Sequence, residues 1–207
     1  MRVNVYVESG VAMAYDFGTA AWVFDVKFWG LCGQGLTETE ALAGLRAALP
    51  AEAALNVVER IQGDESAFDR DKTPAAEAEV EHTLEILAEV RTELLVILLE
   101  ITETDLDRSI TQDAGFAAWS TVRERAWHIA DTESRYYLPS LGLPSKPRAQ
   151  DLVTELRDSA EHVRKTLRAM PRNLSRNNDG EAWTSTKLLR RLAWHEPGEL
   201  AAIRQGA

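Results

Sequence analysis

The tripeptide Ala-Trp-His occurs twice in the chain, ending at His128 and at His195. Acidic residues follow each copy, including Asp131 and Glu133 after the first and Glu199 after the second. The chain has four histidines, so the two copies account for half of them. Imidazole and carboxylate groups that converge inside a helix bundle can bind a divalent metal. The repeat therefore indicates a candidate metal site.

The second histidine lies on the apolar face of a predicted helix. At steps of four, three, four and three residues, this face carries Leu188, Leu192, His195, Glu199 and Ala202. A buried histidine and glutamate are costly without partners, and a metal ion would satisfy both. Their spacing places the two side chains one turn apart, as in helical metal sites. The alternative is that both are core residues that hydrogen-bond to neighbouring helices.

The first histidine lies at the edge of the apolar face of its helix. That face includes Ala126 and Ile129 and continues to Glu133, whereas His128 is about 100° round from Ile129. Glu133 is therefore predicted to point inward, either as a competing third ligand or as a group that orients a histidine. Asp131 is a second candidate for the same role.

Pro197 lies between the two candidate ligands of the last helix. Proline in a helix interior removes a backbone hydrogen bond and clashes with the preceding turn. It would kink the helix, or His195-Glu196 would end one segment and Gly198 begin another. If the helix breaks there, the pairing of His195 with Glu199 is lost.

Two arginines, Arg190 and Arg191, precede the second Ala-Trp-His. They belong either to a solvated helix face or, beside a metal, to a site that binds the carboxylate of a substrate. The sequence contains no recognisable serine or cysteine triad that would compete with metal chemistry. It does not identify a catalytic residue.

Four helices are predicted to position these residues. Apolar side chains recur at helical spacing over residues 74–101, 119–138 and 152–170, and again from residue 183. Only Arg91 interrupts the apolar face of the first helix. Polar segments or loops rich in glycine and proline separate the helices, and we expect a polar loop over 172–181. Together these patterns predict a four-helix bundle.

The N-terminal part has a different period. Residues 3–7 and 20–29 alternate or are rich in aromatic and branched side chains, which is typical of strands. A helix begins at Thr37, in a capping box with Glu40. We predict an α+β fold in which residues 1–63 form a small sheet-and-helix domain, 64–73 a polar linker and 74–207 the bundle.

The composition excludes several classes of protein. A net charge of −10 argues against nucleic-acid partners, which need a basic patch. The apolar run 94–101 is too short to cross a bilayer, so we expect no membrane partner. The N-terminus lacks the pattern of a signal peptide, and the single cysteine, Cys32, permits no internal disulfide. We therefore expect a cytoplasmic protein.

The helical half resembles the DinB/YfiT-like superfamily. The similar segments are WST at 119–121 with AWHIADTE at 126–133, and WT at 183–184 with LLRRLAWHE at 188–196. The match covers roughly residues 74–205. It implies a four-helix bundle whose metal is held by one histidine of the second helix and a His-x-x-x-His pair of the fourth. By position, the ligands here would be His128, His195 and Glu199, a His₂Glu set that zinc enzymes also use.

The resemblance also implies a function. It favours zinc or nickel as the metal and a small-molecule substrate. The expected reactions are metal-dependent hydrolysis, or transfer or isomerisation that depends on a low-molecular-weight thiol. In the N-terminal half, FWGLCGQG at 28–35 with TETEAL at 37–42 is similar to the HicB-like antitoxin domain, which implies a fold here but no antitoxin role.

A second class of function fits the same residues. In this alternative the protein is a non-catalytic binding or regulatory protein, and the sheet domain recognises a partner or ligand. The bundle is then a scaffold with a vestigial metal site and the interface of a homodimer. The departures at Glu199 and Pro197 favour this alternative. The sequence therefore leaves open whether the protein is an enzyme.

Overall fold

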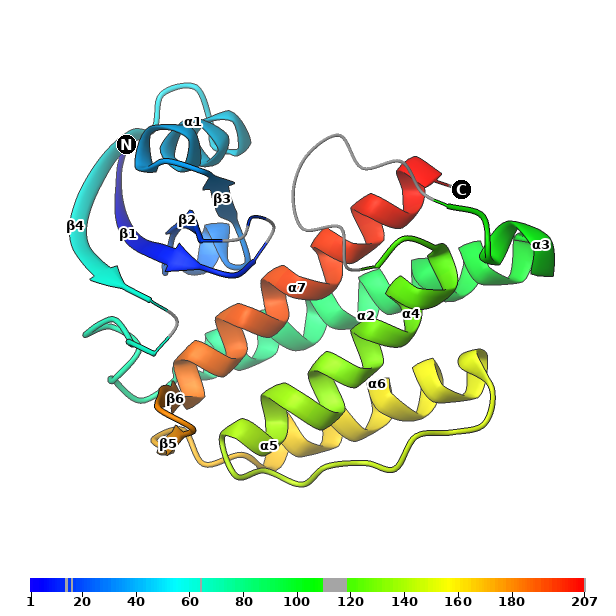
Figure 1. Cartoon of the computed structure of the whole chain (residues 1–207). Helices are drawn as coiled ribbons and strands as arrows, with labels where there is room; N and C mark the ends of the chain where they lie inside the picture. The colour runs from blue at the N-terminus through cyan, green and yellow to red at the C-terminus, as the bar shows by residue number, and fades with distance from the viewer. Residues whose placement is uncertain (14, 16, 64, 110–118, 207) are drawn as a thin grey trace.

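The computed structural model describes residues 1–13, 15, 17–63, 65–109 and 119–206 and has an α+β fold, as predicted (Figure 1). In the N-terminal part it contains the strands β1 (Arg2–Val11), β2 (Gly18–Trp22), β3 (Cys32–Gly35) and β4 (Ala54–Gln62), the short helix η1 (Val26–Phe28) and the helix α1 (Glu38–Ala48). Within the described residues these strands form one sheet in the order β3-β2-β1-β4. β1 is antiparallel to β2 and parallel to β4.

Helix α1 covers one face of this sheet. Thr37 caps it, and the Glu40 side chain accepts a hydrogen bond from the backbone of Thr37, so the predicted capping box is present. Ala41 and Leu45 are buried against the sheet. A Cβ added at Gly33 would lie 2.1 Å from the carbonyl oxygen of Ala41, so glycine allows the close approach of α1 to β3.

The second part of the chain is a helix bundle. Its helices are α2 (Glu77–Glu100), α3 (Glu103–Leu106), α4 (Val122–Asp131), η2 (Thr132–Tyr137), α5 (Leu138–Ser140), α6 (Leu152–Ala169) and α7 (Ser185–Gly206), with a hairpin of β5 (Ser175–Asn178) and β6 (Glu181–Thr184) before α7. α2 packs against both α6 and α7, and α4 packs against the same two helices. The predicted four-helix bundle is therefore present, with η2 and α5 continuing α4.

The segment before α7 differs from the prediction. We expected residues 172–181 to form a polar loop and Trp183-Thr184 to begin a helix. Instead, residues 175–184 form the β5–β6 hairpin, and Trp183 and Thr184 end its second strand. Asp179 and Gly180 connect the strands, both with positive φ (52° and 91°). Asp-Gly is a favoured pair for a two-residue hairpin turn because these residues tolerate that conformation. This dipeptide was the signal for the hairpin.

Helix α7 continues through Pro197. The expectation that the helix could break at this residue is wrong, because Ser185–Gly206 is one helix. Proline cannot donate to the carbonyl of Ala193, four residues earlier. That carbonyl lies against Gly30 of the N-terminal part, where an added Cβ would be 2.7 Å from the carbonyl oxygen. Gly30 thus covers the carbonyl that Pro197 leaves without a helical donor, and the unbroken helix keeps His195 and Glu199 one turn apart.

We expect Pro197→Ala to stabilise the protein. Proline in a helix interior is about 3 kcal/mol less favourable than alanine. Some of this gain will be lost because the Ala193 carbonyl also packs against Gly30. The free energy of unfolding should therefore rise by about 1–3 kcal/mol, as measured by urea denaturation. The loop variant Pro147→Ala is the control and should change little; a less stable Pro197→Ala protein would contradict this interpretation of α7.

The sheet and the bundle share one hydrophobic core. Trp22 and Trp29 of the N-terminal part belong to the same buried cluster as Leu188 and Leu192 of α7. In Figure 1 the sheet and α1 lie to one side of the bundle, next to α7. Phe68 and Asp71, from the predicted linker 64–73, are fully buried. These two residues thus anchor the segment in the interface, while Asp69 and Lys72 beside them are exposed.

Buried ion pairs also join the two parts. Arg190 donates to Asp71 at 2.8 and 3.0 Å, and Arg191 donates to Glu8 of β1 at 3.0 Å. Trp22 Nε1 donates to the other oxygen of Glu8 at 2.9 Å. Neither arginine lies on a solvated face, because both are buried. The structure places Arg190 and Arg191 in contact with carboxylates of the chain itself, so a role in binding a substrate carboxylate gains no support.

Candidate metal centre

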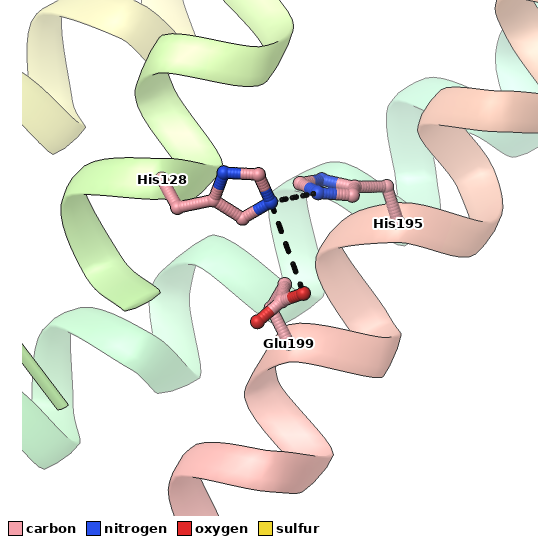
Figure 2. Close-up of side chains that lie close together, drawn as sticks. All are labelled: His128, His195 and Glu199. Carbon is pink, nitrogen blue, oxygen red and sulfur yellow. Dashed lines mark hydrogen bonds and ion pairs between the residues drawn. The ribbon is translucent and has the colours of Figure 1, made fainter. Parts of the chain in front are cut away.

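Helices α4 and α7 bring the three residues of the predicted ligand set together (Figure 2). His128 Nε2 lies 3.1 Å from His195 Nε2 and 4.0 Å from Glu199 Oε1. One ligand atom from each of the three residues lies within 4.8 Å of the other two. The first histidine thus reaches inward from the edge of its helix face and meets the pair on α7.

This geometry fits a metal centre with small side-chain movements. Tetrahedral zinc, with bonds of about 2.0–2.2 Å, separates its ligand atoms by about 3.3 Å. The distance between the two imidazole nitrogens is slightly shorter, at 3.1 Å, and the distance from His128 to Glu199 is longer, at 4.0 Å. The shorter distance also suits a hydrogen bond between two imidazoles, with the proton on one nitrogen. The arrangement therefore supports either a metal or a hydrogen-bonded histidine pair.

Both imidazoles are held in the neutral form. Burial lowers the pKa of His195 to about 3, and the neighbouring His128 and Arg191 act in the same direction. Burial and Arg125 lower the pKa of His128 to about 4. Neutral imidazole is the form that binds metals, because its unprotonated nitrogen offers a lone pair. At neutral pH the two histidines are therefore ready to act as ligands.

Glu199 is held by a neighbouring arginine. Burial raises the pKa of its carboxyl group, and Arg125 opposes this effect. Arg125 Nη1 donates to Glu199 Oε2 at 2.7 Å. The other oxygen, Oε1, is the one that lies towards His128. The ion pair thus fixes which oxygen of Glu199 faces the histidines.

Hydroxyl and aromatic groups surround the histidines. Thr132 Oγ1 lies 3.1 Å from His128 Nδ1 and 3.4 Å from its Nε2; as the acceptor for a proton on Nδ1, it would leave Nε2 unprotonated. The Trp119 ring stacks on His128 with ring centroids 4.5 Å apart. The ring of Tyr137 meets His195 edge-on at 5.7 Å. One aromatic ring thus packs against each imidazole.

A π-helical segment follows His128. Residues Thr132–Tyr137, labelled η2, form this wider turn at the end of α4. Such turns are rare and are frequent at functional sites. The segment begins at the threonine that contacts His128 and ends at the tyrosine that contacts His195. It therefore places two groups around the cluster that a regular helix would orient differently.

The two alternative ligands lie in other interactions. Glu133 points inward as predicted, but it pairs with Arg91 of α2 at 2.8 Å. Burial and the nearby carboxylate of Glu196 raise its pKa well above the ordinary value, against the effect of Arg91. Asp131 pairs with Arg135 at 2.6 Å. Within the described residues, the group that could hold a metal includes neither acid, so the structure does not bring Glu133 or Asp131 to the cluster as an alternative ligand.

We expect Thr132→Val to weaken metal binding about 10-fold. Loss of a group that orients a histidine ligand typically lowers metal affinity by about 10–100-fold. Valine keeps the size of this buried side chain but cannot accept the hydrogen bond from Nδ1. Calorimetric titration with Zn²⁺ measures the change. Thr166→Val, which alters a buried threonine of α6, is the matched control; equal affinities of the two variants would exclude an orienting role for Thr132.

The fold and the cluster together define a four-helix bundle with a candidate metal centre. No protein-family model matches the chain, and no curated protein is similar to it at a significant level. A solved structure, YfiT from Bacillus subtilis, is similar; it is described as a probable metal-dependent hydrolase with an unusual four-helix bundle topology. The TM-score is 0.51 and the identity 18%, over 70% of this chain and 92% of YfiT. At this identity the similarity shows that the chain has the YfiT-like fold.

No helix within the described residues combines the length and the apolar character needed to cross a membrane.

Proposed function

We propose that the protein is a metal-dependent hydrolase that binds a divalent cation, zinc or nickel, through His128, His195 and Glu199. The observation that carries the proposal is the convergence of three ligand atoms within 4.8 Å. Two imidazoles and a carboxylate are a ligand set of catalytic zinc sites, in which a fourth position stays open. The similar bundle of YfiT, itself described as a probable metal-dependent hydrolase, supports the same conclusion.

The residues around the ligands prepare the site for this chemistry. A divalent cation acts as a Lewis acid and lowers the pKa of a water molecule that it binds, which is what hydrolysis requires. The neutral histidines supply lone pairs from Nε2, and Thr132 fixes the orientation of His128. Arg125 keeps one oxygen of Glu199 occupied and leaves the other towards the histidines.

A thiol-dependent transferase or isomerase would use the same centre. In that reaction a low-molecular-weight thiol would replace water, since a cation also lowers the pKa of a thiol. Its substrate, like that of the hydrolase, would be a small molecule. The two reactions differ in whether turnover requires an added thiol.

A non-catalytic protein is the second candidate. Two contacts favour it: the 3.1 Å approach of the histidine nitrogens and the 2.7 Å ion pair of Glu199 with Arg125. These contacts give His128 Nε2, His195 Nε2 and Glu199 Oε2 a partner without a cation, whereas His195 Nδ1 is buried without a hydrogen-bond partner. On this proposal the bundle is a scaffold that binds a partner or a second copy of the chain.

The small sheet with a helix supports a HicB-like N-terminal domain over residues 1–63, followed by a linker and the bundle. We also propose that the protein is cytoplasmic, that it binds neither nucleic acid nor membranes, and that it can form a homodimer. The net charge of −10 supports the absence of a nucleic-acid partner.

A panel of small substrates tests the proposed reaction. Ester, amide and phosphoester substrates are incubated with protein loaded with Zn²⁺ or Ni²⁺, with chelator-treated protein and with His128→Ala, each with and without a low-molecular-weight thiol. We expect turnover of at least one substrate by the loaded protein and none by the other two. Turnover only with thiol would favour the transferase, and equal turnover by chelated protein would exclude a metal-dependent reaction.

A further inference from the structure

A cavity opens between helices α2 and α6, apart from the histidine cluster. Its volume is about 290 Å³, just below the usual range of about 300–1,000 Å³ for small-molecule sites. None of His128, His195 and Glu199 lines it. Its walls are mainly apolar and are formed by Leu84, Leu87, Ala88, Leu95, Ala160 and Val163. The cavity therefore offers space for a short aliphatic group.

Charged residues that are fully buried also line this cavity. Arg91 donates to Glu196 Oε1 at 2.5 Å and to Glu133 Oε2 at 2.8 Å. Its remaining terminal nitrogen, Nη1, donates to Ser159 at 2.8 Å and to the carbonyl of Leu156. Every side-chain nitrogen of Arg91 thus donates a hydrogen bond, and two carboxyl groups pair with this one guanidinium.

One oxygen of each carboxyl group is left over. Within the described residues, Glu133 Oε1 and Glu196 Oε2 are buried and accept no hydrogen bond. A buried oxygen without a partner is costly, more so when its group is charged. The two carboxyl groups can share one proton, as the raised pKa of Glu133 indicates, or both left-over oxygens can accept hydrogen bonds from a cationic donor.

We propose that this cavity binds a small aliphatic amine. The ammonium group donates hydrogen bonds to Glu133 Oε1 and Glu196 Oε2, and the aliphatic chain lies against Leu84, Leu87 and Val163. The ligand reaches the cavity between the exposed residues Ala88 and Thr92 of α2 and Arg157 and Arg164 of α6, all of which line it.

The test compares three molecules of similar shape. The wild-type chain is titrated with hexylammonium, hexanol and hexanoate, and binding is followed by thermal unfolding and calorimetry. Hexylammonium at about ten times its Kd should raise Tm by about 3–5 °C. Hexanol and hexanoate should raise it less at the same concentration. Equal binding of hexanol, preference for hexanoate, or no binding of hexylammonium would each overturn the proposal.

Two variants locate the binding. Glu133→Gln keeps the shape of the side chain but cannot ionise to pair with an ammonium group, and it should lower hexylammonium affinity by about 10–100-fold. Ala88→Trp places a large ring at the exposed mouth and should abolish binding without disturbing the core. The control Glu89→Trp changes a neighbouring exposed residue that does not line the cavity. Unchanged hexylammonium binding in Ala88→Trp would place the amine elsewhere and overturn the proposal.

Binding should also be independent of the metal centre. His128→Ala removes a candidate ligand on α4 that does not line the cavity. This variant should bind hexylammonium with the wild-type Kd. A loss of binding in His128→Ala would show that the amine occupies the histidine cluster and would overturn the separate site.

Discussion

His195→Ala should lower the affinity of the protein for Zn²⁺ by more than about 1,000-fold. Structural zinc sites in zinc-finger peptides contribute about 10–16 kcal/mol, and loss of one of only three protein ligands here should remove a substantial share of the binding free energy. His195 is the most buried of the three residues, and burial keeps its imidazole neutral. Calorimetric titration at pH 7, after treatment with a chelator, measures the change.

The control for this variant is another histidine. His82→Ala alters a partly exposed residue of α2 that pairs with Glu85, and it should bind Zn²⁺ like the wild type. His128→Ala should match His195→Ala, because both imidazoles face the same point. Glu199→Ala should have a smaller effect, since Arg125 competes for its carboxylate. If His195→Ala bound Zn²⁺ as tightly as His82→Ala, the cluster would not be the metal site.

Glu8→Ala should destabilise the fold by about 3–5 kcal/mol, which is the usual result of removing one partner of a buried ion pair. Glu8 is fully buried and accepts from Arg191 and Trp22. Without Glu8, Arg190 and Arg191 stay buried but lose one of the carboxylates that pair with them. Urea denaturation measures the change. Glu38→Ala, which breaks an exposed pair with Arg60, is the control and should have little effect.

The contribution of Glu8 should disappear in acid. Burial alone would raise the pKa of Glu8, but Arg191, Arg190 and Lys187 together hold it below its usual value. A carboxyl group whose pKa is lowered by folding stabilises the protein above its unfolded pKa of about 4.3, and the gain is lost as pH falls towards the folded pKa. Wild-type stability should therefore fall below about pH 5 more steeply than that of Glu8→Gln. Parallel pH profiles would contradict a stabilising charge on Glu8.

The periodic parts of the fold were predictable from the sequence. Apolar side chains at helical spacing indicated the bundle helices, and the same spacing placed His195 and Glu199 on one face. Helical spacing alone did not place His128 in the cluster, because this residue lies at the edge of the apolar face of its helix. The family resemblance predicted His128 as a ligand, and the structure places its Nε2 atom 3.1 Å from His195 Nε2.

Features that depend on distant partners were not predictable. Arg191 meets Glu8, which is 183 residues away in the chain, so its burial leaves no local pattern. The π-helical segment at Thr132–Tyr137 depends on how one turn packs, and its composition is that of an ordinary helix. Arg91 did leave a signal, because it interrupts an apolar helix face, but its partners Glu133 and Glu196 lie on other helices.

The most direct test of the metal centre is diffraction from crystals soaked in Zn²⁺, with anomalous data collected at the zinc edge. The proposal predicts one strong anomalous peak at a point about 2.0–2.2 Å from His128 Nε2, His195 Nε2 and Glu199 Oε1. It also predicts that the peak is absent from His195→Ala crystals. Soaked wild-type crystals with no peak between these atoms, and with the histidine nitrogens still about 3 Å apart in hydrogen-bond contact, would contradict it.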